Sequence, residues 1–143
     1  MKRALYFSIL ILTYIFVTGM GSLRGSGDVM VPEPETNYKV TLTDQADVST
    51  ELEEFTCEGQ VYLTGKRGEA HVSIGFDKIS SIRFFREKDG LIGEVHLKDG
   101  KVIPLKLEKD MCCYGMFAYG KLKIAMKDIK SIIVHGVVST EEE

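Results

Sequence analysis

The chain has 143 residues, of which 44% are hydrophobic and 27% are charged, and its formal net charge at pH 7 is −3. This length suits one domain with a hydrophobic core. Lysines and arginines are scattered through an acidic chain, which excludes nucleic acid and anionic membrane surfaces as expected partners.

The N-terminus has the layout of a secretory signal peptide. Lys2 and Arg3 precede an uncharged apolar run at 4–17, and the small residues of "TGMGS" follow. This run is shorter than the ~18 to 20 apolar residues that cross a bilayer as a helix. We therefore predict a signal helix in residues 1–21, export to the periplasm or the cell exterior, and no stable membrane insertion after cleavage. An uncleaved N-terminal membrane anchor is the alternative.

The remaining chain divides into three parts. Residues 22–37 contain Gly, Ser and two Pro but few large apolar groups, which is typical of a flexible linker. Residues 139–143 form an acidic tail that is expected to fray. A single β domain is predicted between them, at residues 38–138.

Within this domain the apolar residues recur at every second position, as in the run Ala70, Val72, Ile74 and Phe76. This period is typical of strands with one buried face, and no stretch of ten or more residues there has the helical period. Glycine-rich segments such as "TGKRG" at 64–68 and "YGMFAYG" at 114–120 separate the runs and are interpreted as turns. The predicted fold class is therefore all-β.

The sequence also repeats itself. "FDKISSI" at 76–82 is followed fifty residues later by "MKDIKSI" at 126–132, and V-x-L-x-D at 40–44 recurs at 95–99. We predict two ~50-residue β-β-β-β repeats, repeat one at 38–86 and repeat two at 93–138. Two copies are too few for a solenoid. They favour a pseudo-twofold sandwich or small barrel in which each copy covers the apolar face of the other.

The repeated phrase itself predicts a corner rather than a site. Apolar residues change from a spacing of two to a spacing of three at Phe76, Ile79 and Ile82, which requires one tight helical turn at about 76–79. An Asp/Ser/Lys site is the functional alternative. It lacks a histidine partner, and it would not explain why both copies carry the phrase.

This phrasing, V-x-L-x-D with I-x-S-I, resembles that of short exported bacterial proteins of unassigned function, and also that of small β-barrel modules. The resemblance covers roughly the 100 residues of the body. It implies no catalytic, cofactor-binding or metal-binding residue, and we assign none.

Three cysteines, Cys57, Cys112 and Cys113, are present in a chain predicted to be exported. Adjacent cysteines do not pair easily, because their Cα atoms are closer than the usual disulfide span. A disulfide between Cys57 and either Cys112 or Cys113 is therefore predicted, with one thiol left over. Three reduced cysteines acting as small core residues are the alternative.

The segment "MCCYGMFAYG" at 111–120 differs most between the repeats. It carries no charge, whereas the matching segment of repeat one contains Lys66 and Arg67. A strand buried on both faces is one explanation. The other is an exposed aromatic and Met-rich surface for a partner, for self-association or for an apolar ligand. The interaction candidates are Lys66, Arg67, Met111, Tyr114, Met116, Phe117 and Tyr119.

The function predicted from the sequence is that of an exported, non-enzymatic β domain that binds a partner protein or an envelope component and needs no cofactor. A homo-oligomer is compatible with this prediction. The alternative is a periplasmic redox or metal-handling protein that uses the three cysteines and the histidines His71, His96 and His135, which are expected on outward faces of separate strands.

Overall fold

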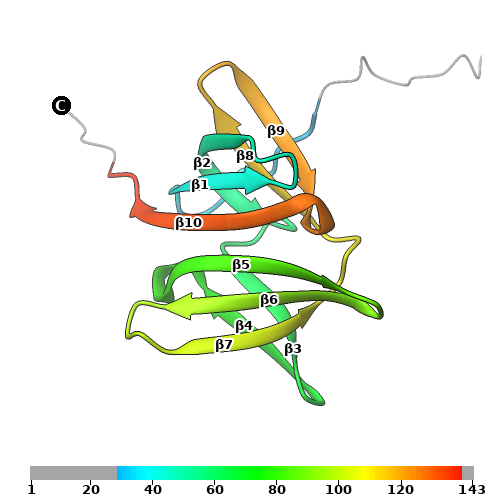
Figure 1. Cartoon of the computed structure of the whole chain (residues 1–143). Helices are drawn as coiled ribbons and strands as arrows, with labels where there is room; N and C mark the ends of the chain where they lie inside the picture. Colours follow the sequence, from blue (N-terminus) through cyan, green and yellow to red (C-terminus); the bar gives the residue numbers. More distant parts are fainter. Residues whose placement is uncertain (1–28, 140–143) are drawn as a thin grey trace, which may run out of the picture.

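The computed structural model describes residues 29–139, and every regular element in this range is a β-strand or a short 3₁₀ turn (Figure 1). The elements are β1 Tyr38–Asp44, β2 Ser49–Cys57, β3 Tyr62–Arg67, β4 Ala70–Gly75, η1 Phe76–Lys78, β5 Ile79–Glu87, β6 Gly90–Leu97, β7 Val102–Leu107, β8 Cys112–Phe117, β9 Gly120–Ala125, η2 Met126–Asp128 and β10 Ile129–Val137. The predicted all-β class is confirmed.

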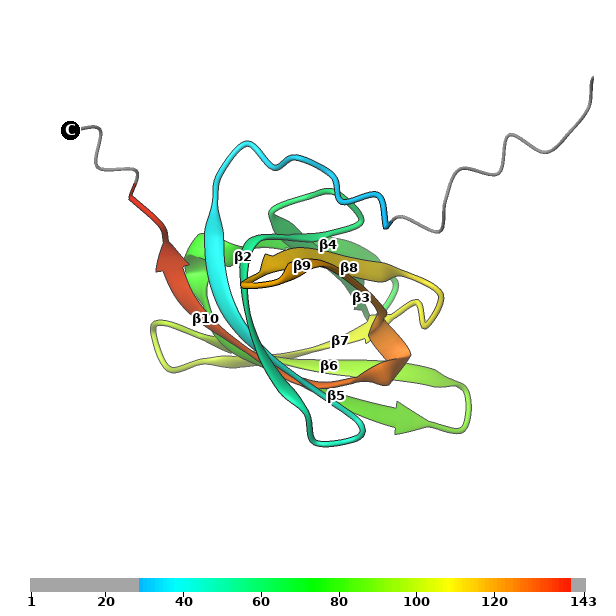
Figure 2. The same ribbon diagram turned by 90° about the horizontal axis from the view of Figure 1, so that it is seen from above.

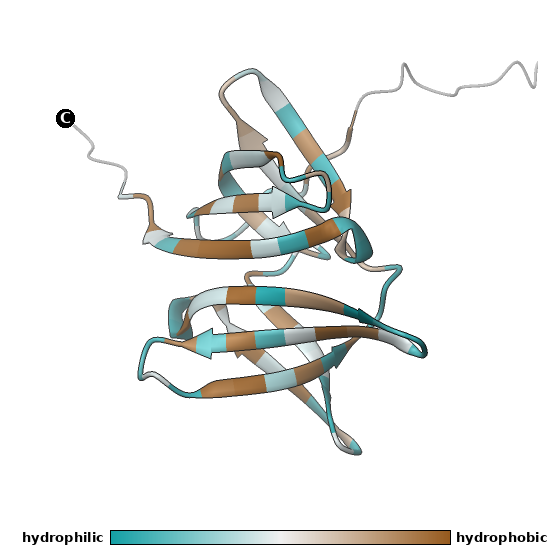
Figure 3. Ribbon diagram, in the orientation of Figure 1, coloured by the Kyte–Doolittle hydropathy of each residue, from teal (hydrophilic) through white to brown (hydrophobic). Residues whose placement is uncertain are grey.

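The strands form one antiparallel sheet in the order β4-β3-β7-β6-β5-β10-β1-β2-β8-β9. The sheet curls around the core as a half-barrel, as the view from above shows (Figure 2). Along most strands apolar and polar residues alternate, so that one face lines the core (Figure 3). Strands β4 and β9 are the two edges of the sheet.

The strand order is symmetric about its centre. If each of β1 to β5 is matched to the strand five places later in the chain, so that β1 matches β6 and β4 matches β9, the order read from one edge equals the order read from the other. The centre of this order is the β5–β10 pair, where Ile82 and Ile132 lie opposite each other. Strand β1 pairs with β10, and β6 pairs with β5.

The register of the first strands differs from the V-x-L-x-D alignment. Val40 lies opposite Leu52 and Val134, and Gly93 lies opposite Leu105 and Phe84. In its strand pairing Gly93 therefore corresponds to Val40. The V-x-L-x-D motif had instead matched Val40 to Val95, two residues later. A shift of two residues leaves every side chain on the same face, so the apolar pattern alone does not distinguish the two alignments.

Ten strands are present where two four-stranded repeats would give eight. The difference arises at the two segments interpreted as turns. Strand β3 continues to Arg67 and β8 to Phe117, so each hairpin turn has only two residues. Gly68 supplies the positive φ, +62°, that a two-residue turn needs.

Two glycines in these segments serve strand packing rather than a turn. A Cβ atom on Gly65 would lie 2.9 Å from Cβ of Leu105, and one on Gly115 would lie 2.9 Å from Cβ of Leu52. Both contacts are too short for a real Cβ atom, so these positions allow neighbouring segments to approach closely.

We expect Gly65→Ala and Gly115→Ala each to lower the free energy of unfolding by about 1 to 3 kcal/mol, because the added methyl group overpacks a core contact. Urea unfolding followed by circular dichroism measures this effect. Lys101→Ala, in an exposed turn, is the control and should stay within about 0.5 kcal/mol of wild type. Unchanged stability of both glycine variants would contradict the close approach.

The two predicted corners are confirmed. Turns η1 and η2 occupy equivalent places, and the isoleucines that follow them, Ile79, Ile82, Ile129 and Ile132, are fully buried. In η1 the Phe76 ring lies 5.3 Å from that of Phe55 and 5.6 Å from that of Tyr38, measured between centroids. The phrase is thus part of the core, as expected for a structural role.

The predicted signal peptide at 1–21 lies outside the described residues. Of the predicted linker, residues 29–37 are described and form no strand, but Asn37 is bonded to the domain: its side-chain oxygen accepts the Glu54 N–H at 2.6 Å and its carbonyl accepts the Val138 N–H at 2.8 Å. No helix within residues 29–139 is long and apolar enough to cross a membrane.

Candidate functional site

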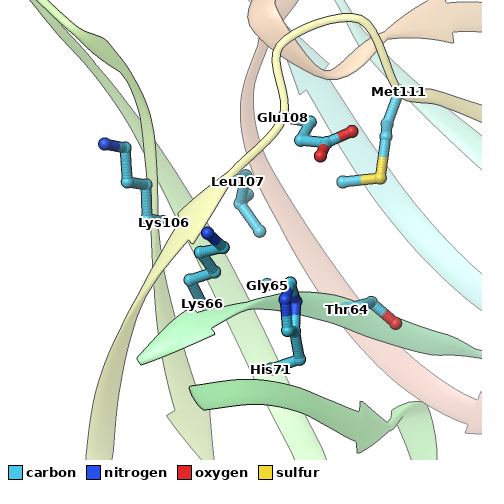
Figure 4. Close-up of a pocket in the computed structure, with 8 residues that line it drawn as sticks. All are labelled: Thr64, Gly65, Lys66, His71, Lys106, Leu107, Glu108 and Met111. Atoms are coloured by element: carbon cyan, nitrogen blue, oxygen red, sulfur yellow. The ribbon is translucent and has the colours of Figure 1, made fainter. Parts of the chain in front are cut away.

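A pocket of about 350 Å³ opens where β3 meets β7 (Figure 4). We call it the seam pocket. Its lining residues come from β3, β4, β7 and the loop that follows β7: Thr64, Gly65, Lys66, His71, Lys106, Leu107, Glu108 and Met111. This volume suits a small ligand or one group of a larger molecule.

The pocket forms where β3 and β7 approach closely at Gly65 but pair along only a short length. Their ladder contains one pair of directly opposed residues, Lys66 and Lys106. Strand β7 ends at Leu107, and the chain then turns away through Glu108, whose carbonyl accepts the Met111 N–H at 3.2 Å. The apolar floor comprises Gly65 and Leu107, which are buried, and Met111, which is half-buried against the core.

Three basic residues occupy neighbouring positions on the strands that line this pocket. Lys66 is opposed by His71 on β4 and by Lys106 on β7, and we call these three residues the basic row. Like charges directly opposite in a sheet are destabilising. Figure 4 shows Lys66 and His71 pointing toward the loop that carries Glu108 and Met111, whereas the Lys106 side chain extends away from them. The basic row therefore concentrates positive charge above an apolar floor.

Within residues 29–139, no member of the basic row has an ion pair or a side-chain hydrogen bond, and neither has Glu108. Other basic groups do find acids, for example Arg86 with Asp128 at 3.2 Å. A basic row that has no acidic partner among the described residues is an arrangement that attracts anions.

The structure brings two of the predicted interaction residues, Lys66 and Met111, into one pocket although they are 45 positions apart in the sequence. Arg67 is exposed at the end of β3 and does not line the pocket. The other members that contribute, His71, Lys106 and Glu108, were not predicted as a group. Alternation places Lys106 on an outward face, but no signal in the sequence indicates that β7 lies beside β3.

The remaining candidates form a second surface, the aromatic hairpin at residues 111–120. Tyr114 and Met116 are half-buried on the outward face of β8, so this strand is covered on one face only. Tyr119, in the turn, is 93% exposed, and its ring meets that of Phe117 edge-to-face at 6.1 Å. The Lys123 ammonium group lies 5.8 Å from the centre of the Tyr114 ring.

The cysteines divide into a buried pair and a third residue. Cys57 and Cys113 are Cα partners on β2 and β8, and their sulfur atoms lie 2.8 Å apart. All three cysteines are free thiols in the structure, so the predicted disulfide stays a prediction, with Cys113 as the nearer partner. Burial, followed by the hydrogen bond with Cys57, raises the pKa of the Cys113 thiol.

The histidines lie on three different strands, β4, β6 and β10. His96 Nε2 is 2.7 Å from Oε1 of Glu94, and His135 Nε2 is 2.6 Å from Oγ1 of Thr41. In the described part of the chain no three side chains of His, Cys, Asp or Glu gather in a way that could hold a metal ion.

Residues 34–136 match the model of one protein family, whose description reads "Uncharacterised protein". The chain belongs to that family. The match runs from just before β1 almost to the end of β10, so it includes both the seam pocket and the aromatic hairpin. No curated protein and no solved structure matches the chain. The resemblance to proteins of unassigned function is confirmed.

Proposed function

We propose that this protein is an exported, non-enzymatic binding domain that recognises an anionic component of the cell envelope at the seam pocket. The observation that carries the proposal is the unpaired basic row above an apolar floor. Since the chain as a whole is acidic, a local basic site attracts an anionic group without making the whole surface attractive to anions.

We also infer that the domain consists of two copies of one five-stranded unit, β1–β5 and β6–β10. The inference rests on the symmetric strand order and on the matching contacts of Gly65 with Leu105 and of Gly115 with Leu52. Features that both copies share belong to the framework. Features found in one copy only are the better candidates for function.

The seam pocket is such a feature. The seam between β8 and β2 is equivalent to that between β3 and β7, and there Met116 lies opposite Glu53 where the first seam has Lys66 opposite Lys106. The second seam is also paired at more positions, including Thr56 with Tyr114. The two opposed lysines are therefore not a requirement of the framework.

The exposed Tyr119 favours a second candidate function, the binding of a partner protein at the aromatic hairpin. Aromatic and Met side chains are enriched at protein interfaces, where they provide apolar area with few rotatable bonds. Tyr119 meets the half-buried Phe117 edge-to-face at the tip of the β8–β9 hairpin, so a partner that binds Tyr119 would lie close to Phe117.

The experiment that separates these functions is retention of a detergent-free envelope fraction on the immobilised domain, with and without prior protease treatment of the fraction. We expect retention to survive the protease, to fall at least tenfold for Lys66→Met, and to stay unchanged for the exposed control Lys101→Met. Met is chosen because it occupies the equivalent position in the second seam.

A different result would favour the aromatic hairpin. Retention that disappears after protease treatment, and that falls for Phe117→Ser with Tyr119→Ser while Lys66→Met binds normally, would replace the envelope proposal with the partner-protein function. Retention that none of these variants changes would contradict both functions.

A further inference from the structure

We propose that the ligand group of the seam pocket is a single phosphoryl group, held by Lys66, His71 and Lys106, and that Glu108 accepts a hydrogen bond from a hydroxyl or ammonium group of the same ligand. This inference rests on the function proposed above and specifies its ligand class.

The chemistry of the basic row selects phosphate over carboxylate. Directly opposed residues of an antiparallel pair have Cβ atoms about 4.5 to 5.5 Å apart, so the flexible chains of Lys66 and Lys106 can bring both ammonium groups to one anion. Ammonium groups act as point charges with three donors each, which suits the several oxygens of a phosphoryl group. A carboxylate has only two oxygens and a single negative charge, so it would use fewer of these donors.

The number of cationic side chains at the pocket indicates the charge expected of the ligand group. Two lysines balance the charge of about −1.5 to −2 that a phosphomonoester carries near neutral pH. Binding also relieves the repulsion between the opposed ammonium groups, because the anion lies between them. The His71 imidazole, opposite Lys66 on the other side, adds a further donor to the same anion.

A single group is favoured over a polyanion. The pocket has about 350 Å³ of space, which suits one small group rather than several consecutive phosphates of a polymer. The one acid that lines the pocket, Glu108, accepts hydrogen bonds only when ionised. It therefore favours a ligand that carries a donor beside the phosphoryl group, with Leu107 and Met111 in position to contact the ligand's carbon atoms.

Titration of ¹⁵N-labelled protein by NMR at constant ionic strength tests this inference, with inorganic phosphate and phosphoethanolamine as probes and chloride as the reference anion. We expect saturable shifts in residues 64–71 and 106–111, and binding of phosphoethanolamine at least threefold tighter than that of phosphate. Lys66→Met and Lys106→Met should each weaken binding at least tenfold. Lys101→Met should leave binding unchanged, and Glu108→Gln should remove the preference for phosphoethanolamine.

Shifts that chloride reproduces, or a dissociation constant that Lys66→Met leaves unchanged, would overturn the inference. So would equal binding of the two probes by wild type and Glu108→Gln. Spectra of the variants outside the two segments should match wild type, which separates loss of the site from loss of the fold.

Two further arms identify the source of the phosphoryl group and separate this inference from the proposed function. Vesicles that display phosphomonoester headgroups should compete with the soluble probe if the source is a lipid, and should not compete if it is a soluble or polymer-borne phosphate. Envelope retention that depends on Lys66 without phosphate binding would overturn the ligand class alone. Phosphate binding without such retention would overturn the proposed function alone.

Discussion

Oxidation of the purified domain is expected to join Cys57 to Cys113 and to raise its free energy of unfolding by about 4 kcal/mol. The two residues are separated by 56 positions, and a loop of that size loses much of its conformational entropy in the unfolded chain when it is closed. The oxidation removes two protons and two electrons from the thiols, and an exchangeable disulfide such as oxidised glutathione accepts them.

The sheet geometry selects Cys113 over Cys112. The Glu58 N–H donates to the Cys112 carbonyl at 2.9 Å, which makes Cys57 and Cys113 a non-hydrogen-bonded pair. Such pairs have Cα atoms about 4.5 Å apart, within the range of disulfides. Cys112 precedes Cys113 on the strand, so its side chain lies on the opposite face of the sheet.

The pH dependence of stability should separate the reduced and oxidised forms. Because burial raises the pKa of the Cys113 thiol, the folded chain keeps a proton there at a pH where the unfolded chain has lost it. Raising the pH above the ordinary thiol range, about 8.5, therefore favours unfolding of the reduced protein. The oxidised protein has no thiol at this position and should lack that decline.

Urea unfolding at pH 7 and above pH 9, with and without reductant, measures both effects, and alkylation followed by mass spectrometry counts the free thiols. Cys112→Ala should retain the reductant-sensitive stabilisation, and Cys113→Ala should abolish it. If Cys113→Ala kept it, or if the oxidised wild type had three alkylatable thiols, the pairing of Cys57 with Cys113 would be wrong.

The sequence predicts the framework well because the framework depends on local periodicity. Alternating apolar residues give the strands, and the change of spacing at Phe76 and Met126 gives both corners. The apolar period does not determine the register of the strands or the role of each glycine. Alternation alone cannot decide whether Val40 corresponds to Gly93 or to Val95, because these two residues lie on the same face of the strand. It also cannot show that Gly65 lies in a strand, at a close contact with Leu105, rather than in a turn.

The sequence predicts only some residues of the seam pocket, because the others meet through pairing between distant strands. Comparison of the two predicted repeats indicates Lys66 and Met111, because the charged segment of the first predicted repeat is uncharged in the second. Their meeting with Lys106 depends on pairing between β3 and β7, which are distant in sequence and share a single directly opposed pair. No local pattern encodes such a contact.

Replacement of Phe76 by Ala is expected to lower the free energy of unfolding by about 3 to 5 kcal/mol. The Phe76 side chain is fully buried, and its removal leaves a cavity beside the rings of Phe55 and Tyr38. Phe76→Met should cost less than about 1.5 kcal/mol, because methionine keeps most of the volume and fills irregular gaps. Phe85→Ala is the control, because Phe85 lies on the outward face of β5 and is exposed. It should change the free energy of unfolding by less than either Phe76 variant does.

The contrast between Ala and Met tests the duplication as well as the core. Met126 occupies the place in the second corner that Phe76 occupies in the first, and it is also fully buried. It follows β9 and precedes Ile129, as Phe76 follows β4 and precedes Ile79. If the two copies share one framework, the first corner should accept the residue of the second. Urea unfolding of the three variants decides this. A Phe76→Met protein as unstable as Phe76→Ala would mean that the two corners pack differently, and the assignment of function from differences between the copies would then lose its basis.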